Sequence, residues 1–212
     1  MPLVVRTLSD QIYEVLRQRI MMHEIKPGHV IRQDALAAEL GVSKIPVREA
    51  LSRLEGGGMV QSAANRGYIA SPLSACEIMD IFTLRMLIEP ATAAATAVAA
   101  TDAERDEVTT AYETLLKGGA NFRDTMMARR RMMLSLLIQE DRPTHTSFVV
   151  QLFDRAERYH PPNPTLDFLG VDSLDSLTTA WLARDAEATL SVYKSRLEHR
   201  AADALATLPL LM

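Results

Sequence analysis

Apolar residues recur with helical spacing along most of this 212-residue chain, and the pattern changes clearly only once. Apolar positions at i, i+3, i+4 and i+7 form one face of a helix, whereas alternation is typical of a half-buried strand. The helical spacing first predicts three helices, near residues 8–20, 36–41 and 43–54. The first of them carries the stripe Leu8, Ile12, Val15, Leu16 and Ile20. Two short strands are predicted next, near Val60–Ser62 and Tyr68–Ala70.

From residue 74 onward the pattern is helical throughout. Ser74 with Glu77, and Thr101 with Glu104, have the S/T-x-x-E spacing of a capping box, which begins a helix. Glycine pairs and prolines end helices, and Pro143 indicates a turn. The predicted helices span about residues 74–100, 101–117, 122–139, 147–159, 173–184 and 186–205. We therefore expect a bundle of six or seven antiparallel helices in this part of the chain.

Residues 36–54, with the sequence LAAELGVSKIPVREALSRL, place two helices around a tight turn at Gly41. The second helix has an apolar face that packs inward, formed by Val47, Ala50, Leu51 and Leu54. Lys44, Arg48 and Ser52 lie on the opposite face, where they are free to reach phosphates and base edges. This is the pattern of a helix-turn-helix, whose second helix enters a DNA major groove.

The two predicted strands complete this DNA-binding unit. Their turn, Asn65-Arg66-Gly67, places a basic side chain at the tip of a hairpin, and Gly67 permits the positive φ that a tight turn requires. A helix-turn-helix followed by a hairpin is a winged helix, and Arg66 can reach the minor groove or the backbone. For Arg48 an alternative stays open, namely a solvated charge or an ion pair with Glu55.

The segment LAAELGVSKIPVREAL, with the following Leu54 and Gly58 and the turn at residues 65–67, resembles the GntR family of bacterial transcription regulators. The resemblance implies binding to double-stranded DNA, as a homodimer on a palindromic operator. It also implies DNA contacts through Ser43, Lys44, Arg48, Arg66 and Gly67. Lys44 stands where the family usually has Arg, and so lacks the bidentate fork for guanine. Ile45 replaces a small polar residue, which makes contact with a thymine methyl group possible.

Charge and cysteine content narrow the class of protein. The net charge is −4, but residues 1–72 carry 9 Lys+Arg against 7 Asp+Glu, or +2, and residues 73–212 carry 14 against 20, or −6. We therefore expect two domains, residues 1–72 for DNA binding and residues 73–212 for effector binding and dimerisation. The single Cys76 excludes an internal disulfide. Because no leader and no apolar run of membrane length is evident, we expect a cytoplasmic protein with no membrane partner.

The helical part resembles, more loosely, the FCD-type effector domain of the FadR-like branch of the GntR family. Arg85–Glu89 with the following Ala-rich run, and Ala180 with Asp185–Ala188, carry this resemblance. Many such domains hold a divalent metal through one Asp and three His. Here the four matching positions read Arg129, Met133, Leu174 and Arg196, and these side chains cannot bind a hard divalent ion. We therefore expect neither a metal nor another cofactor.

The residues at these four positions indicate a ligand other than a metal ion. Arg129 and Arg196 would face the former metal position, and Arg85 matches the family's Arg that holds a ligand carboxylate. A guanidinium stays charged when buried and binds a carboxylate in a fork. We therefore expect a DNA-binding regulator, a repressor, controlled by a small organic acid. Its expected effector contacts are Arg85, Arg129, Met133, Leu174 and Arg196.

Other hypotheses stay open at this point. Arg85 can instead pair with Glu89, while residues 129–131 form a solvated face and Met126, Met127, Met132 and Met133 belong to an ordinary core. The regulator could use a metal held by other residues, or the bundle could dimerise and sense no ligand. An enzyme would need a nucleophile, an acid–base pair or a phosphate-binding loop, and the sequence offers no such motif.

Overall fold

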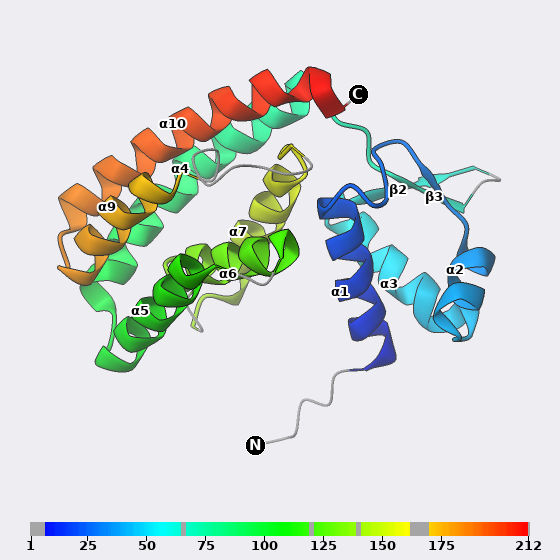
Figure 1. Ribbon diagram of the computed structural model, residues 1–212, viewed down its shortest axis with the longest axis horizontal. Helices are drawn as coiled ribbons and strands as arrows, with labels where there is room; N and C mark the ends of the chain where they lie inside the picture. Colours follow the sequence, from blue (N-terminus) through cyan, green and yellow to red (C-terminus); the bar gives the residue numbers. More distant parts are fainter. Residues whose placement is uncertain (1–6, 65–66, 119–120, 139–140, 162–169, 212) are drawn as a thin grey trace.

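The computed structural model describes residues 7–64, 67–118, 121–138, 141–161 and 170–211. The first part of the chain forms α1 (Leu8–Met21), β1 (Val30–Ile31), α2 (Gln33–Leu40), α3 (Lys44–Gly56), β2 (Val60–Ala63) and β3 (Gly67–Ala70). The second part forms α4 (Ala75–Ala99), α5 (Asp102–Lys117), α6 (Phe122–Ser135), α7 (Pro143–Glu157), α9 (Val171–Leu182) and α10 (Ala186–Leu211). Figure 1 shows the helical bundle on the left and α1–α3 with the small sheet on the right. The predicted fold class, a winged helix-turn-helix followed by a helical bundle, is confirmed.

The N-terminal helices enclose their own hydrophobic core. The apolar stripe predicted for α3 is fully buried, with 0% exposure at Val47, Ala50, Leu51 and Leu54. On α1, Ile12, Leu16 and Ile20 are buried in the same cluster. The prediction was wrong for Leu8 and Val15, which are 48% and 37% exposed because the buried face of α1 is narrower than the sequence pattern. Burying each large aliphatic side chain contributes about 1.5–3 kcal/mol, so the inner face fixes α3 while its outer face stays free.

A left-handed glycine makes the turn between α2 and α3. Gly41 has φ 66°, and its N–H donates to the carbonyl of Ala38. Ser43 is then the extended N-cap residue of α3, so the helix begins at Lys44, one residue after the start predicted from the sequence. The sheet beside these helices is antiparallel in the order β1-β3-β2, with Val30 opposite Ile69 and Ser62 opposite Tyr68. Strand β1 was not predicted, because two residues are too few to show an alternating pattern.

Helix α4 runs beside α10 along one edge of the bundle (Figure 1). Ile78, Ile81, Ala93 and Ala97 on its inner face are buried in the second hydrophobic cluster, which extends from Leu73 to Leu208. By length and composition α4 is apolar enough to cross a membrane, which corrects the prediction that no apolar run reaches that length. However, 56% of that stretch is buried inside the bundle, as in the core helix of a helical domain.

In the bundle, the helix boundaries differ most from the predicted ones at three places. Helix α7 begins at Pro143 rather than near residue 147, because a proline at the first helical position has the required φ and needs no N–H partner. Helix α6 ends at Ser135, before the predicted end near residue 139. Helix α10 extends to Leu211 instead of ending near residue 205. In contrast, the capping boxes placed the starts of α4 and α5 correctly, and Thr101 with Glu104 makes both reciprocal hydrogen bonds.

Candidate nucleic-acid interface and ligand cavity

The outer face of α3 is accessible along its whole length. The residues predicted to contact DNA there are all exposed, namely Ser43, Lys44, Ile45, Arg48 and Ser52. The apolar side chain of Ile45 has 62% of its surface exposed, which is unusual for an isoleucine and suits contact with a thymine methyl group. The face therefore combines two cations, a hydroxyl and an apolar side chain on one rigid helix, as direct readout of a major groove requires.

One cation of this face already has a protein partner. The Lys44 Nζ lies 2.8 Å from Asp34 Oδ1 at the start of α2. Because the two side chains are 66% and 76% exposed, water screens the pair and its contribution to stability is small. For Arg48 the alternative partner was Glu55, but the Glu55 carboxylate accepts a hydrogen bond from the Ser62 backbone N–H at 3.0 Å. Asp34 thus holds Lys44 beside the predicted groove-facing residues.

A second set of contacts fixes α3 against α1. Arg53 Nη1 donates to Asp10 Oδ1 at 2.6 Å, and its guanidinium carbon lies 4.5 Å from the centroid of the Tyr13 ring. Hydrogen bonds from the Thr7 hydroxyl and amide, followed by the one from Arg53, lower the pKa of Asp10 to about 2. Asp10 is therefore ionised at neutral pH and keeps Arg53 directed at α1 rather than at the outer face of α3.

The wing is described only in part. Arg66, the predicted minor-groove residue, lies outside the described residues. Gly67 is exposed and has φ 86°, the positive value predicted for a tight turn. A Cβ atom at Gly67 would stand 3.1 Å from the carbonyl oxygen of Ile31, so the close approach of β1 adds a second reason for glycine here.

A different kind of site lies buried in the bundle, where α4, α6, α7 and α10 meet. The cavity has a volume of about 10 Å³ open to the centre of a water molecule, which is room for about one water. Its lining is composed of Phe82, Arg85, Arg129, Met133, Ala156, Glu157, Tyr193, Arg196, Leu197 and Arg200. Four of the five predicted effector residues thus lie around one cavity. The fifth, Leu174, is 0% exposed and packs in the hydrophobic core, outside the cavity lining.

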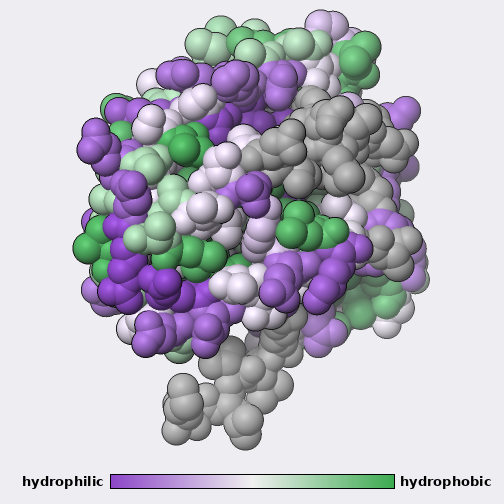
Figure 2. All heavy atoms as spheres, turned by 60° about the vertical axis from the view of Figure 1, so that its left-hand side comes forward, coloured by the Kyte–Doolittle hydropathy of each residue, from purple (hydrophilic) through white to green (hydrophobic). Residues whose placement is uncertain are grey.

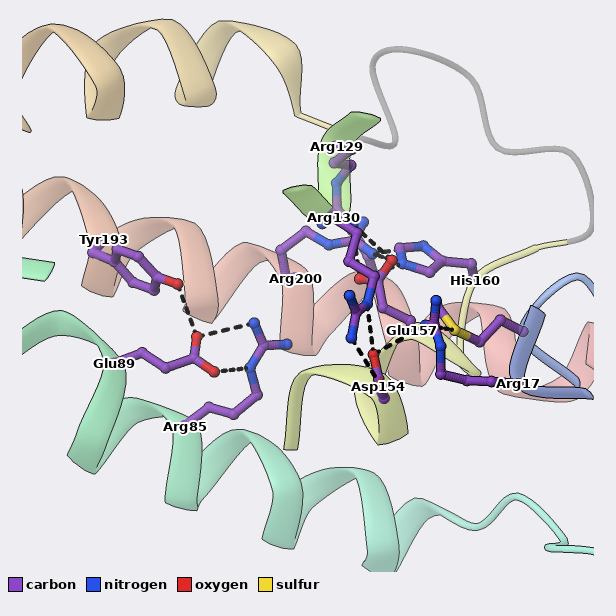
Figure 3. Close-up of polar contacts among 12 residues, drawn as sticks. Arg17, Arg85, Glu89, Arg129, Arg130, Asp154, Glu157, His160, Tyr193 and Arg200 are labelled. Carbon is purple, nitrogen blue, oxygen red and sulfur yellow. Dashed lines mark hydrogen bonds and ion pairs between the residues drawn. The ribbon is translucent and has the colours of Figure 1, made fainter. Parts of the chain in front are cut away.

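Arg85 forms an ion pair on its own helix. Its Nε donates to Glu89 Oε1 at 2.7 Å and its Nη2 donates to Oε2 at 3.0 Å, a bidentate fork. The Tyr193 hydroxyl also donates to Glu89 Oε2, at 2.9 Å (Figure 3). This is the Arg85–Glu89 alternative considered from the sequence, with one difference: the pair is buried, at 6% and 0% side-chain exposure, rather than solvated.

Arg129 belongs to a longer buried chain of polar contacts. Its Nη1 donates to both oxygens of Glu157, at 2.7 and 2.8 Å. His160 Nε2 lies 2.9 Å from Glu157 Oε1, while Arg200 Nη2 lies 2.9 Å from His160 Nδ1. A cation on Nδ1 and a carboxylate on Nε2 select the neutral imidazole with its proton on Nε2. Figure 3 shows Arg129, Arg200 and His160 gathered around Glu157.

The pKa values describe the electrostatics of this cluster. Burial lowers the pKa of His160 to about 4, so the imidazole is neutral at pH 7. Burial by itself would raise the pKa of Glu157, but the charge of Arg129 and the contact with His160 hold it well below its ordinary value. Burial and the neighbouring Arg129 lower the pKa of Arg200 to about 9, and the same two causes lower that of Arg196. The cavity therefore has a positive potential that an added anion would relieve.

The arginines of α6 differ in their surroundings. Arg129 is buried, Arg130 is half-buried and Arg131 is exposed, so the solvated face considered from the sequence describes only Arg131. The Arg129 Nε is buried and has no hydrogen-bond partner among the described residues. A buried N–H without an acceptor is costly, and such an atom beside a cavity indicates a ligand or a water molecule. Of the methionines of α6, Met133 lines the cavity and Met126 and Met132 are buried, whereas Met127 is 43% exposed.

A metal does not fit the four positions that the sequence resemblance aligned with metal ligands. Arg129 and Arg196 present guanidinium N–H groups, which are hydrogen-bond donors, and Met133 and Leu174 are buried apolar side chains. Among the described residues, no three His, Cys, Asp or Glu side chains come close enough to hold a metal ion. The donor set around the cavity instead suits an anion.

Sequence reasoning missed several members of this cluster. Glu157, His160 and Arg200 were not singled out as part of a cavity, nor were Asp154 and Arg158. The segment DRAERYH at residues 154–160 has the charge pattern of a solvated helix end, although Asp154, Glu157, Arg158 and His160 are at most 3% exposed. The signal that could have found them is the i, i+3 spacing of Asp154 and Glu157, because these two carboxylates equal the adjacent Arg129 and Arg130 in number and are opposite to them in charge.

The geometry defines a winged helix followed by a helical bundle, and the comparisons with known proteins show which proteins share these parts. Residues 8–69 match the family model described as "Bacterial regulatory proteins, gntR family". This match covers the winged helix, so residues 8–69 are similar to the DNA-binding domain of that family. The Nta operon transcriptional regulator of Aminobacter aminovorans is 38% identical over 82 residues, or 39% of this chain and 39% of its own length. The transcriptional repressor RspR of Escherichia coli strain K12 is 31% identical over 86 residues, or 41% and 38% of the two chains.

The matches to these curated relatives span less than half of their length, whereas the solved structures cover the whole fold. McbR/YncC of E. coli has a TM-score of 0.81 and covers 95% of this chain and 99% of its own, at 21% identity. A GntR regulator from Rhodococcus sp. RHA1 has a TM-score of 0.69 and covers 93% and 97%, also at 21% identity. At this level of identity the likeness establishes the fold alone, including that of the helical bundle.

Proposed function

We propose that this protein is a cytoplasmic transcription regulator, a repressor, whose affinity for a palindromic operator is controlled by a small organic acid. DNA binding is assigned to residues 1–72, and effector binding and dimerisation to residues 73–212, an FCD-type domain. The acid binds at the cavity of the bundle, against Arg85, Arg129 and Arg196, without a metal, and the cavity, which has room for about one water, widens to admit it. The observation that carries the proposal is the buried Arg129 Nε, which lacks an acceptor beside a cavity lined by four guanidiniums.

The chemistry of the cavity selects the class of ligand. Its positive potential favours a carboxylate, which accepts hydrogen bonds from more than one guanidinium. Phe82, Met133 and Leu197 supply apolar surface to the same cavity. An acid with an aliphatic or aromatic tail therefore satisfies both parts of the site better than a small dicarboxylate does.

The test is thermal unfolding of the purified, chelator-treated protein with sodium octanoate, benzoate and succinate. Octanol and benzyl alcohol serve as controls that keep the tail and lack the charge. We expect octanoate or benzoate to raise the melting temperature and the alcohols not to. Arg129→Lys, which keeps the charge and loses the fork, should weaken the effect, whereas Arg131→Lys on the exposed face of α6 should not. Stabilisation by no acid, or a stoichiometric transition metal in elemental analysis, would reject the proposal.

The proposal includes a homodimer, since one winged helix makes few contacts and twofold symmetry doubles them on a palindrome. Helix α4 offers an exposed apolar face for the second copy. The large side chains on it are Met79 (50% exposed), Leu84 (46%), Leu87 (71%) and Val98 (54%). The space-filling view shows further apolar patches scattered among polar ones on the side of the bundle (Figure 2). Leu87→Glu should give monomers in light scattering, while Leu116→Glu on α5, at a side chain that is 55% exposed, should leave the dimer intact.

A further inference from the structure

The last turn of α7 and the residues after it, which we call the coupling turn (residues 154–160), touch both the cavity and the winged helix. Toward the cavity this segment presents Glu157, whose carboxylate also contacts His160. Toward the winged helix it presents Asp154, which binds Arg17 of α1. Figure 3 shows Asp154 and Glu157 on the same helix, each with its own group of arginines. One short segment thus joins the proposed ligand site to the DNA-binding domain.

The contact with α1 is buried and specific. Arg17 Nη1 donates to Asp154 Oδ1 at 3.2 Å, and the two side chains are 3% and 4% exposed. Arg130 donates to the same carboxylate, from Nε to Oδ1 at 2.8 Å and from Nη2 to Oδ2 at 3.2 Å. Arg129 and Arg130 are neighbours on α6, and they hold Glu157 and Asp154, which lie three residues apart on α7. Because both carboxylates lie on one turn of α7, a movement of that turn would change the contact of Glu157 with Arg129 and the contact of Asp154 with Arg17 together.

Other contacts of the coupling turn reach the winged helix and the linker. The carbonyl oxygen of His160 lies 2.9 Å from Nε2 of His23, which follows α1. Arg158 donates to the carbonyl oxygens of Gly58, after the recognition helix, and of Ser71, after the wing. The Arg158 side chain is only 2% exposed. The position of the DNA-binding domain thus depends on this segment at three separated points.

Glu157 occupies the place that a ligand carboxylate would take. Its two oxygens accept from Arg129 Nη1, and the remaining cavity holds about 10 Å³, which is too small for a carboxylate group. An acid can reach Arg129 only if Glu157 moves away. Because the potential of the cavity is positive, exchanging one carboxylate for another preserves the charge balance.

We propose that Glu157 is a built-in substitute for the ligand carboxylate, and that its displacement from Arg129 moves the coupling turn and releases the Asp154–Arg17 contact that holds α1. This inference rests on the proposed function for the identity of the displacing group, an organic acid. The coupling itself needs no ligand, so it can be tested separately.

The experiment is amide hydrogen exchange on the full chain, read on peptides that cover α1. Glu157→Gln removes the charge of the substitute carboxylate at constant size. Glu89→Gln is the matched control, because Glu89 is equally buried and binds Arg85 of the same cavity, and within the described part of the chain its carboxylate makes no hydrogen bond or ion pair with the coupling turn or with α1. Asp154→Asn tests the contact between the coupling turn and Arg17 of α1. Should Glu157→Gln fail to fold, Glu157→Asp keeps the charge and shortens the reach.

We expect Glu157→Gln and Asp154→Asn to speed exchange in α1 by about tenfold, as the loss of a hydrogen bond to a charged group should do. Glu89→Gln should leave exchange in α1 within about twofold of the wild type. The proposed coupling is overturned if hydrogen exchange in α1 does not change in Glu157→Gln, or if it speeds up as much in Glu89→Gln.

A second arm adds sodium octanoate to the wild-type protein. Faster exchange in α1, together with a higher melting temperature, supports displacement of Glu157. Stabilisation by octanoate without a response in α1 overturns the coupling and leaves the proposed function standing. If α1 responds to Glu157→Gln while octanoate, benzoate and succinate all fail to stabilise the protein, the proposed function is rejected and the coupling turn is upheld.

Discussion

Removing Arg129 alone should destabilise the bundle far more than removing Arg129 and Glu157 together. The two side chains are 4% and 2% exposed, and one guanidinium nitrogen binds both carboxylate oxygens. In Arg129→Met the Glu157 carboxylate stays buried with the neutral His160 beside it. Leaving one member of a buried ion pair without its partner costs about 3–5 kcal/mol. A domain is stable by about 5–15 kcal/mol in total, so this loss is large.

The double variant Arg129→Met/Glu157→Gln removes the charge on both sides at nearly constant volume. Replacing a buried pair by neutral groups is often neutral or stabilising, because both desolvation penalties disappear together with the attraction. We therefore expect its free energy of unfolding to lie near or above that of the wild type. The change in the free energy of unfolding of the double variant should differ from the sum of the two single-variant changes by about 3 kcal/mol or more. This difference measures the interaction between the two side chains.

The assay is urea unfolding followed by the fluorescence of Trp181, the single tryptophan of the chain. Trp181 is 1% exposed and donates to the Thr96 hydroxyl at 3.0 Å, so its emission reports on the bundle rather than on the winged helix. Arg131→Met, on the exposed face of α6, is the control and should stay within about 0.5 kcal/mol of the wild type. If the double variant were as unstable as Arg129→Met, or if Arg129→Met cost less than about 1 kcal/mol, the reasoning about a buried pair would be refuted.

Three further predictions concern DNA binding and pH. Arg48→Ala should weaken binding to a selected operator by about 1–3 kcal/mol in a band-shift titration, and unchanged affinity would mean that α3 is not the recognition helix. Asp34→Asn should free Lys44 and raise affinity at low salt by up to about fivefold, fading at high salt; an equal gain at all salt concentrations would contradict an electrostatic cause. The stability of the bundle should fall in acid. His160 has its pKa lowered from 6.5 to about 4 and Glu157 has a depressed pKa, so the unfolded chain takes up protons first. The free energy of unfolding should therefore decrease as the pH falls from 6.5 through about 4. A free energy of unfolding that does not change in this interval would contradict the burial of His160.

The DNA-binding domain was predictable because its signals are local. Residues within a turn or two of one another determine each of its main features. These features are the apolar stripe of α3, the turn at Gly41 and the helix start after Ser43. The start of α7 was missed for a local reason as well, since Pro143 begins a helix as readily as it ends one. Strand β1 depends on pairing with β3 far along the chain, which its own two residues do not encode.

Of the charged residues around the cavity, only arginines could be predicted from the sequence. The resemblance to a family of effector domains placed Arg85, Arg129 and Arg196, and these residues do line one cavity. The residues that contact these arginines could not be predicted, because the contacts join residues far apart in the sequence. Arg129 and Glu157 are 28 residues apart, and His160 and Arg200 are 40 residues apart. No periodicity in a single helix encodes such pairs, and helix packing alone decides whether a charged face is solvated or buried.

The placement of buried charge favours a role in control over a role in stability. A well-packed apolar core would be at least as stable as the Arg129–Glu157 pair, because burying two ions offsets most of their attraction. The pair instead lies where it can exchange one carboxylate for another, next to the segment that contacts Arg17 of α1. A ligand shifts an equilibrium only by the difference in its affinity for the two states. In the mechanism that we propose, Glu157 supplies that difference, because the acid can bind Arg129 only in the state in which the Glu157 carboxylate has left it.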